Sequence, residues 1–239
     1  MEVVFLTRGG HMKLQDIKKS YSAVISLGSE CGPGIHLRRH SLRKTAFPFD
    51  WVCSHSLAGI NELLRTKFKR YMKFRNMQKI HSYKPGFVLD DQGITTGSHS
   101  HFIKDLKYNV ISVHDFPIVP EQHWMLNYLS FKRTIKQRIQ RMYEWFKKSS
   151  SLLFIRWSVI DIDEDQLKKE TAELEMVLSG CVTGKFSILM IYPTDKVEHL
   201  TEVDWGMSHV CVIYVPVKTD PITDKDIWDH LLDGISIKD

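Results

Sequence analysis

Residues 24–51, VISLGSECGPGIHLRRHSLRKTAFPFDW, hold the most distinctive chemistry of this chain. They begin inside a short apolar run, residues 23–27, and runs of this kind with β-branched residues are typical of a strand buried on both faces. Gly28 ends the run, and the residues up to Gly32 predict a tight turn. A basic amphipathic pattern follows and predicts a helix. The stretch therefore predicts a strand, a turn and a helix in succession.

Cys31 lies in this turn, at the predicted start of the helix. Unpaired N–H groups and the helix dipole stabilise negative charge at a helix N-terminus. The sequence therefore predicts a thiol pKa below its usual value of about 8.5 and a reactive thiolate near neutral pH. The alternative interpretation is a small buried residue, because free cysteine is among the most often buried residue types.

A second candidate residue follows another predicted core strand, residues 109–113, whose end brings His114 and Asp115. Ligands of open α/β sheets gather outside the carboxyl ends of the strands. If the two strands run parallel, Cys31 and His114 lie at the same edge of one sheet, close enough for a hydrogen bond. Asp115 is then a candidate to fix the imidazole tautomer, provided that the chain turns there.

Several segments resemble a bacterial family whose members are described as papain-like cysteine peptidases. They include Ile25-Ser-Leu-Gly-Ser-Glu-Cys31, Phe47-Pro-Phe-Asp-Trp51 and Val113-His-Asp-Phe-Pro117, and the resemblance extends over nearly the whole chain from Met12 onward. It implies Cys31 as nucleophile and His114 as its base. Papain-type enzymes place the nucleophile on a helix packed against a separate barrel, whereas Cys31 directly follows a core strand. We therefore do not expect the two-lobed papain fold.

Four more polar residues are candidates for orienting or anion-binding roles: Asp50, Arg156, Ser29 and Arg38. Asp50 stands between large aromatic residues and is the rival of Asp115 for orienting a histidine. Arg156, near the end of a predicted buried strand, needs a carboxylate or anionic partner because a buried unpaired cation is costly. We expect it to bind an anion or to pair with Asp50 or Asp115. No metal site is predicted, because the four cysteines lack metal-ligand spacing.

The rest of the chain alternates predicted strands with predicted helices. This order predicts an α/β fold with a largely parallel sheet and helices on both faces, in three layers. Residues 76–107 contain several glycine and proline breakers and are interpreted as a loop or short strand. The strands are predicted at residues 152–157, 186–192 and 210–215, and the helices at 56–74, 121–148 and 165–178.

The composition indicates a globular protein: 43% of its 239 residues are apolar, and no Pro-, Gly- or Ser-rich linker divides them. We expect a single α/β domain over residues 12–239. Residues 1–11 are interpreted as a non-native or mis-started extension, because Arg8 to Met12 reads like a translated ribosome-binding site before a start codon. Without a long apolar run or signal peptide, the expected location is cytoplasmic. The net charge of +5 is too dispersed to predict nucleic-acid binding.

Three functions remain open on these grounds. The first is a cysteine-dependent acyl-transfer enzyme, most simply a hydrolase of peptide or other acyl substrates with a Cys-His-Asp site and no cofactor. The second rests on a looser similarity of residues 28–31 to capsule-polysaccharide acetyltransferases. It is a coenzyme A-dependent acetyltransferase of surface-polysaccharide biosynthesis, with Arg38 and Arg39 near the phosphates of the acyl donor. The third is a non-catalytic binding protein on the same fold.

Overall fold

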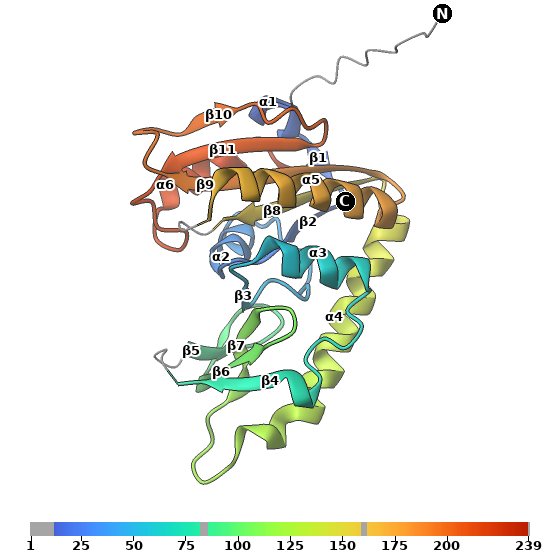
Figure 1. Cartoon of the computed structure of the whole chain (residues 1–239), viewed down its shortest axis with the longest axis vertical. Coiled ribbons are helices and arrows are strands. Elements are labelled where there is room, and N and C mark those ends of the chain that lie inside the picture. The colour runs from blue at the N-terminus through green and yellow to red at the C-terminus, as the bar shows by residue number, and fades with distance from the viewer. Residues whose placement is uncertain (1–11, 82–85, 159–161, 239) are drawn as a thin grey trace, which may run out of the picture.

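The computed structural model of the chain describes residues 12–81, 86–158 and 162–238, so the predicted extension over residues 1–11 lies outside the described residues. Six α-helices, two 3₁₀-helices (η) and twelve strands form within them (Figure 1). The helices are α1 (Leu14–Ile17), α2 (Gly32–Arg39), α3 (Leu57–Arg65), η1 (Phe74–Asn76), η2 (Trp124–Asn127), α4 (Tyr128–Lys148), α5 (Glu164–Cys181) and α6 (Lys225–Leu232). The strands are β1 (Ser20–Tyr21), β2 (Ala23–Ser26), β3 (Val52–Cys53), β4 (Met77–Ile80), β5 (Gly86–Leu89), β6 (Thr95–Asp105), β7 (Val110–Pro117), β8 (Ser151–Trp157), β9 (Lys185–Thr194), β10 (Thr201–Val203), β11 (Val210–Pro216) and β12 (Ser236–Ile237).

The first sheet has five strands in the order β10-β11-β9-β8-β2. Its four longer strands run parallel, and only the edge strand β10 is antiparallel. Every residue of β2 is buried, as are nearly all residues of β8, β9 and β11. Strands covered on both faces read as continuous apolar runs, which is why the sequence predicted these four.

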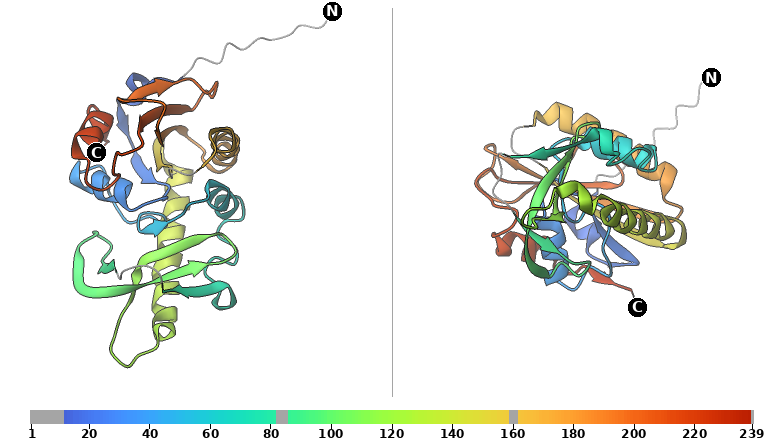
Figure 2. Two further views of the ribbon diagram at one scale, coloured as in Figure 1. Left: turned by 60° about the vertical axis from the view of Figure 1, so that its left-hand side comes forward. Right: turned by 90° about the horizontal axis from the view of Figure 1, so that it is seen from below.

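Helices cover both faces of the first sheet. Apolar residues of α1, α2 and α6 form one core with alternate residues of β8, β9 and β11, while α3, α4 and α5 share a second core with the other residues of these strands. Figure 2 shows the helices on the two sides of this sheet. The predicted three-layer arrangement is therefore found around the first sheet.

The second sheet departs from the prediction of a largely parallel fold. Its strands follow the order β3-β7-β6-β4, with β5 paired to β6, and every pairing is antiparallel. Three of these strands come from residues 76–107, which the sequence analysis interpreted as a loop or short strand. The first half of β6 is exposed, and β4 is at most half-buried. An antiparallel sheet needs only one covered face, so its strands carry a weak apolar signal.

Helix α4 joins the two sheets, and Figure 1 shows it running along both of them. Near its start Phe131 packs against Phe116 of β7, with ring centroids 4.7 Å apart. Near its end Phe146 packs against Phe154 of β8 at 5.5 Å. Helix α3 adds a backbone contact at Gly59, where a Cβ atom would lie 2.1 Å from the carbonyl oxygen of Tyr108. One apolar core therefore extends through both sheets and fixes their relative position.

Candidate active site

The turn after β2 places Cys31 at the start of α2. Gly28 and Ser29 both have positive φ angles, +76° and 80°. Such a conformation is uncommon for serine and persists only when neighbouring contacts hold it. Ser54 supplies them: its Oγ accepts from the Ser29 N–H at 2.8 Å, and its own N–H donates to the Ser29 carbonyl at 3.0 Å. The turn is therefore fixed, and Cys31 becomes the N-cap residue of α2.

The first turn of α2 also has a defined environment. A Cβ atom at Gly32 would lie 2.2 Å from the carbonyl oxygen of Pro221, so only glycine fits at this position. Pro33 has no N–H, whereas the N–H groups of Gly32 and Gly34 belong to the first turn, which has no acceptors inside the helix. Cys31 therefore lies beside backbone donors at a positive helix end.

His114 reaches Cys31 from the second sheet. Its Nε2 atom lies 3.2 Å from the Cys31 Sγ, and its Nδ1 atom lies 2.5 Å from the carbonyl oxygen of Phe87 on β5. Because a carbonyl only accepts, Nδ1 carries the hydrogen and Nε2 presents its lone pair to the thiol. The Trp51 ring stands at 87° to the imidazole, with centroids 5.9 Å apart. The predicted contact between Cys31 and His114 is therefore present.

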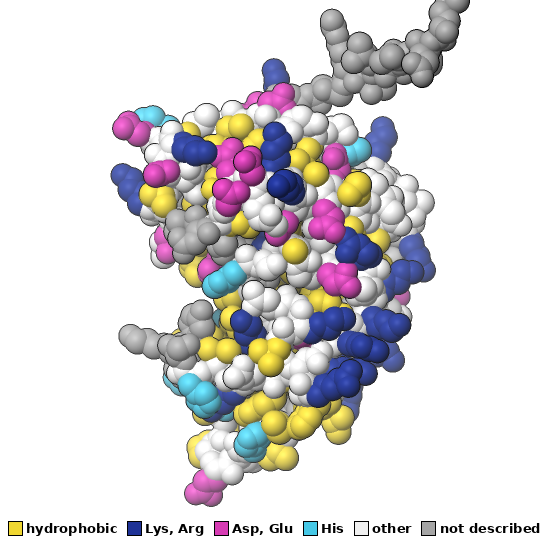
Figure 3. All heavy atoms as spheres, viewed as in Figure 1, with side chains coloured by type: hydrophobic (Ala, Val, Ile, Leu, Met, Phe, Trp, Pro, Cys, Tyr) yellow, Lys and Arg dark blue, Asp and Glu magenta, His cyan; other side chains and the backbone are white. Residues whose placement is uncertain are grey.

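The route by which the two residues meet differs from the prediction. Cys31 follows β2 of the first sheet, whereas His114 lies within β7 of the second sheet and does not end its strand. The prediction that both residues follow parallel strands at the same edge of one sheet is therefore wrong. β3 is the edge strand of the second sheet on the side nearest to the first sheet, and Figure 3 shows the molecular surface hollowed between the two sheets on its left side.

The electrostatics of the pair also correct the prediction. The neighbouring thiol of Cys53, as a hydrogen-bond partner, and burial raise the pKa of Cys31 well above its ordinary value. Burial lowers the pKa of His114, opposed by its hydrogen bond to Phe87 and the charge of Asp115. The direction is therefore opposite to the expected low thiol pKa, because burial and the second thiol both favour the protonated form. Both residues are neutral at pH 7.

Asp115 does not orient His114 by a hydrogen bond. Its carboxylate accepts from the Ser112 hydroxyl at 2.6 Å and from Arg138 Nη1 at 2.9 Å. Neighbouring side chains on a strand point to opposite faces, and β7 continues through both residues without the turn that direct contact needed. The Phe87 carbonyl accepts the hydrogen bond from His114 Nδ1 that was predicted for the Asp115 carboxylate. Asp115 acts on the imidazole only through its charge.

Asp50 is a buried partner of Arg43. Its Oδ2 atom accepts from Arg43 Nε at 2.9 Å and from the backbone N–H of Phe47 at 3.0 Å. Both charged side chains are at most 2% exposed, and burial raises the pKa of Asp50 in spite of the cation beside it. The predicted contacts of Asp50 with a histidine or with Arg156 are therefore both wrong, and its role is to hold the segment before β3.

Arg156 stabilises the turn before Cys31 through hydrogen bonds to the segments on either side of it. Its guanidinium donates to the carbonyls of Leu27 and Ser54, at 2.8 and 2.6 Å, and to the Ser54 hydroxyl at 2.9 Å. Burial lowers its pKa to about 9. Backbone carbonyls and a hydroxyl thus replace the predicted carboxylate or anion, and Arg156 ties the end of β2 to Ser54.

The remaining two candidates lie apart from the pair of reactive groups. The Ser29 side chain is fully buried, so its hydroxyl cannot contact a substrate. Arg38 Nη1 donates to the carbonyl of Gly93 at 2.8 Å. Neither residue shows the orienting or anion-binding contact that the sequence suggested.

The sequence analysis missed three contributors to the site: the Phe87 carbonyl, Trp51 and Cys53. A backbone carbonyl carries no side-chain signal, so Phe87 could not be found from the sequence. Trp51 was named only in a segment that resembles the family, and nothing in the sequence indicated its burial against His114. Cys53 lies 22 positions after Cys31 in the printed sequence, and no known motif spacing marked the two as neighbours.

Comparison with known proteins gives the family. Residues 22–195 match the model of the family described as "Putative papain-like cysteine peptidase", and the chain belongs to this family. An uncharacterised protein of Acanthamoeba polyphaga mimivirus is 28% identical over 178 residues, which cover 72% of this chain and 78% of the viral protein. That relative is viral, so a bacterial origin of the chain stays a prediction. No solved structure matches.

A search for membrane-spanning segments gave a negative result. Among residues 12–81, 86–158 and 162–238, none of the helices combines the length and the apolar character needed to cross a bilayer.

Proposed function

We propose that this protein is a cysteine-dependent acyl-transfer enzyme, most simply a hydrolase that cleaves an amide or ester bond in a peptide substrate. The observation that carries the proposal is the 3.2 Å contact between Cys31 Sγ and His114 Nε2, with Nδ1 held by a carbonyl. This arrangement is that of an activated nucleophile: a thiol, a base within hydrogen-bond reach and a group that orients the base. The family description supports the choice of a peptide substrate.

The geometry indicates how the first half of the reaction would proceed. As Cys31 Sγ attacks the substrate carbonyl carbon, its proton passes to His114 Nε2, and an S–C bond forms. The imidazolium is stabilised by the Phe87 carbonyl and by the charge of Asp115. The N–H groups of Gly32 and Gly34 at the start of α2 are candidate donors to the oxyanion. His114 then returns its proton to the leaving amine or alcohol, and the C–N or C–O bond breaks.

The second half of the reaction uses the same residues. Water attacks the thioester of Cys31 while His114 Nε2 accepts a proton from it, and the S–C bond then breaks as the thiol is reprotonated. Because both residues are neutral at rest, each proton transfer accompanies bond formation and does not precede it. The proposed enzyme therefore works without a preformed thiolate.

A reducing compartment such as the cytoplasm suits this site. Cys31, Cys53, Cys181 and Cys211 are all free, and disulfides are uncommon in cytosolic proteins. We therefore propose a cytoplasmic location for the enzyme.

Within the part of the chain that the structure describes, no contact favours the acetyltransferase alternative. Arg39 pairs with Asp229 and donates to the Lys225 carbonyl, and Arg38 donates to the Gly93 carbonyl. Both guanidinium groups that were expected near the coenzyme A phosphates thus have partners within the protein.

The proposal is tested with p-nitrophenyl acetate, an activated ester that needs no knowledge of the natural substrate. Intact and peptide mass spectrometry should find one acetyl group on Cys31, followed by continued release of nitrophenol as the thioester hydrolyses. Cys31→Ala should abolish both, and Cys181→Ala, at the end of α5, serves as the matched control. An acetylation rate at Cys31 that is unchanged in His114→Ala, or no acetylation at all, would leave the binding-protein alternative as the better account.

A further inference from the structure

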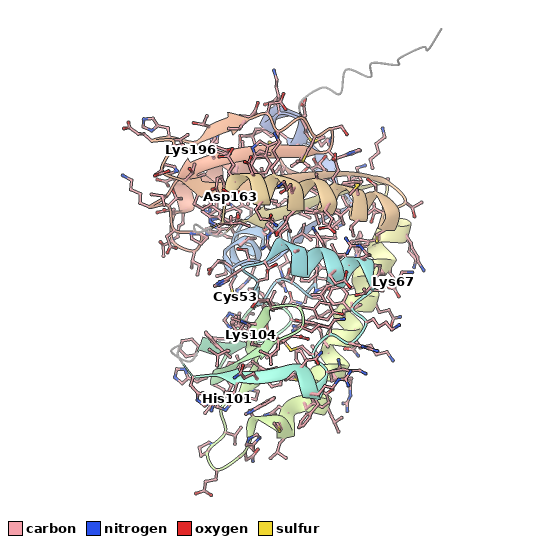
Figure 4. All side chains as sticks on the ribbon, viewed as in Figure 1. Cys53, Lys67, His101, Lys104, Asp163 and Lys196 are labelled. Atoms are coloured by element: carbon pink, nitrogen blue, oxygen red, sulfur yellow. The ribbon has the colours of Figure 1, made fainter. Side chains whose placement is uncertain are left out.

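The candidate site contains a second thiol whose presence the proposed mechanism does not use. Cys53 ends β3 and packs against the small apolar cluster formed by Cys31, Trp51, Ile111 and Val113. Figure 4 shows Cys53 on the side of the second sheet that lies nearest to α2. It is only half-buried, so small solutes have access to it. By contrast Cys181 ends α5 and Cys211 lies within β11.

The backbone holds the two thiols together. Ser54, next to Cys53, is hydrogen-bonded twice to Ser29, two residues before Cys31. On its other side Cys53 is paired in register with Ile111 of β7, the strand that also carries His114. The two thiols are neighbours: Cys53 packs against the cluster that contains Cys31, and its thiol raises the pKa of Cys31. The two segments that carry the thiols are therefore fixed beside each other.

We propose that Cys31 and Cys53 form a reversible disulfide under peroxide, so that Cys53 is a resolving residue for the candidate nucleophile. Formation of the bond rests on this geometry alone. Its consequence, loss of activity while the disulfide persists, rests on the proposed function. A disulfide also protects Cys31, because the alternative products, sulfinic and sulfonic acids, are not reduced by thiols.

The chemistry is balanced by one molecule of hydrogen peroxide. His114 Nε2 takes the proton of Cys31, the sulfur attacks one peroxide oxygen and the O–O bond breaks. The leaving hydroxide takes the proton back from His114 and departs as water, which leaves Cys31 as the sulfenic acid. The Cys53 sulfur then attacks the Cys31 sulfur, the S–O bond breaks and a second water carries away the Cys53 proton. The two thiols lose two electrons and two protons, and the peroxide is reduced to two water molecules. A dithiol reductant reverses the step by thiol exchange.

The experiment treats the full chain with hydrogen peroxide near neutral pH, blocks the remaining thiols with N-ethylmaleimide and maps peptides without reduction. The expected result is a peptide that joins Cys31 to Cys53, two hydrogen masses lighter than its parts and separated by dithiothreitol. In Cys53→Ser the Cys31 peptide should instead accumulate sulfinic acid. Cys181→Ser, which removes a thiol outside the cluster, should behave like the wild type.

The outcomes separate this inference from the proposed function. If Cys31 is oxidised to sulfinic acid equally fast in the wild type and in Cys53→Ser, the resolving role of Cys53 is wrong, whatever the enzyme does. The resolving role would also be overturned if, after peroxide, Cys31 and Cys53 were found in separate peptides that both carry N-ethylmaleimide. If the joined peptide forms but p-nitrophenyl acetate never acylates Cys31 in the reduced protein, the disulfide is established and the acyl-transfer proposal fails. Recovery of Cys31 acylation after dithiothreitol would support both.

Discussion

The two sheets differ in how they are covered, and the candidate site takes one residue from each. The first sheet is enclosed by helices on both faces, and its strands β2, β8, β9 and β11 are buried almost throughout. The second sheet has one covered face, and β6 begins with five exposed residues. The nucleophile thus belongs to the enclosed part, and its base belongs to the part with an exposed sheet. The site therefore depends on the contacts that hold the two parts together, which include α3, α4 and the hydrogen bonds between Ser29 and Ser54.

The two sheets have different roles in the candidate site. On the first sheet, Arg156 of β8 fixes the turn that positions Cys31, together with Ser54 from the segment after β3, so this side supplies a rigid nucleophile. On the second sheet, the β5 carbonyl of Phe87 fixes the imidazole of His114. Changes on the first side should therefore act mainly on stability, and changes on the second side mainly on reactivity.

The largest effect is expected for His114→Ala. Removal of a positioned base costs about 10² to 10⁴-fold in rate, and this histidine has no replacement at the thiol. The acylation rate of Cys31 by p-nitrophenyl acetate measures the loss. His101→Ala, on β6 of the same sheet, is the matched control and should leave the rate unchanged. An equal loss of acylation rate in both variants would mean that either change disturbs the second sheet. The loss in His114→Ala could then not be assigned to its contact with Cys31.

Asp50→Ala should reduce the free energy of unfolding by about 3–5 kcal/mol, because it leaves the cation of Arg43 buried without its partner. Asp50 lies on the segment that passes from the first sheet to the second. Asp229→Ala is the matched control: it breaks a half-exposed ion pair with Arg39, and such surface pairs contribute little to stability. Urea unfolding of both variants makes the comparison. Similar losses would contradict the burial argument.

Asp115→Asn tests which group orients the imidazole. The variant removes the negative charge that pairs with the buried Arg138, so its free energy of unfolding should fall by about 1–3 kcal/mol. The negative charge of Asp115 raises the pKa of His114, so its removal should move the acid limb of the acylation rate to lower pH. The wild-type limb already lies below the ordinary histidine pKa of about 6.5, because burial favours the neutral ring.

The measurement is a pH–rate profile for Cys31 acylation in both proteins, with the plateau rates compared. The plateau should stay close to that of the wild type, since Phe87 still holds Nδ1. A fall of about 10⁴-fold, the loss seen when the acid of a catalytic triad is removed, would restore Asp115 as the orienting group.

The smallest effect is expected for Cys53→Ala, which removes the hydrogen-bonding thiol that raises the pKa of Cys31. The midpoint of Cys31 alkylation should move to lower pH, measured by iodoacetamide labelling over a pH series and peptide mass spectrometry. Cys181→Ala should leave the midpoint in place. A midpoint that ignores Cys53 would indicate that burial alone sets the thiol pKa.

The sequence predicted the enclosed part of the molecule well. The expected strand at residues 23–27, the turn at Gly28 and the helix after Cys31 are all present, with α2 ending at Arg39. The buried strands β8, β9 and β11 lie where continuous apolar runs predicted them. The expected helix over residues 56–74 ends earlier, at Arg65, and positive φ angles follow at Lys67 and Phe68. Strands that are buried throughout leave a strong apolar pattern in the sequence. The early end of a helix at turns that tertiary contacts hold leaves no such pattern.

The second sheet and the partners within the site were decided by the tertiary structure. Residues 76–107 form β-strands that pair with one another and with β7, and Ile103 of β6 shares an apolar core with residues of α4. Their own polar and glycine-rich pattern does not reveal these contacts. Asp50 pairs with Arg43, Asp115 with Arg138, and Arg156 with backbone carbonyls, so none of the predicted charge pairs formed. The sequence indicated Cys31 and His114 because reactive residue types beside predicted strands are a local signal. Their charge states and orienting groups depend on burial and on backbone atoms from distant segments, which only the folded chain brings together.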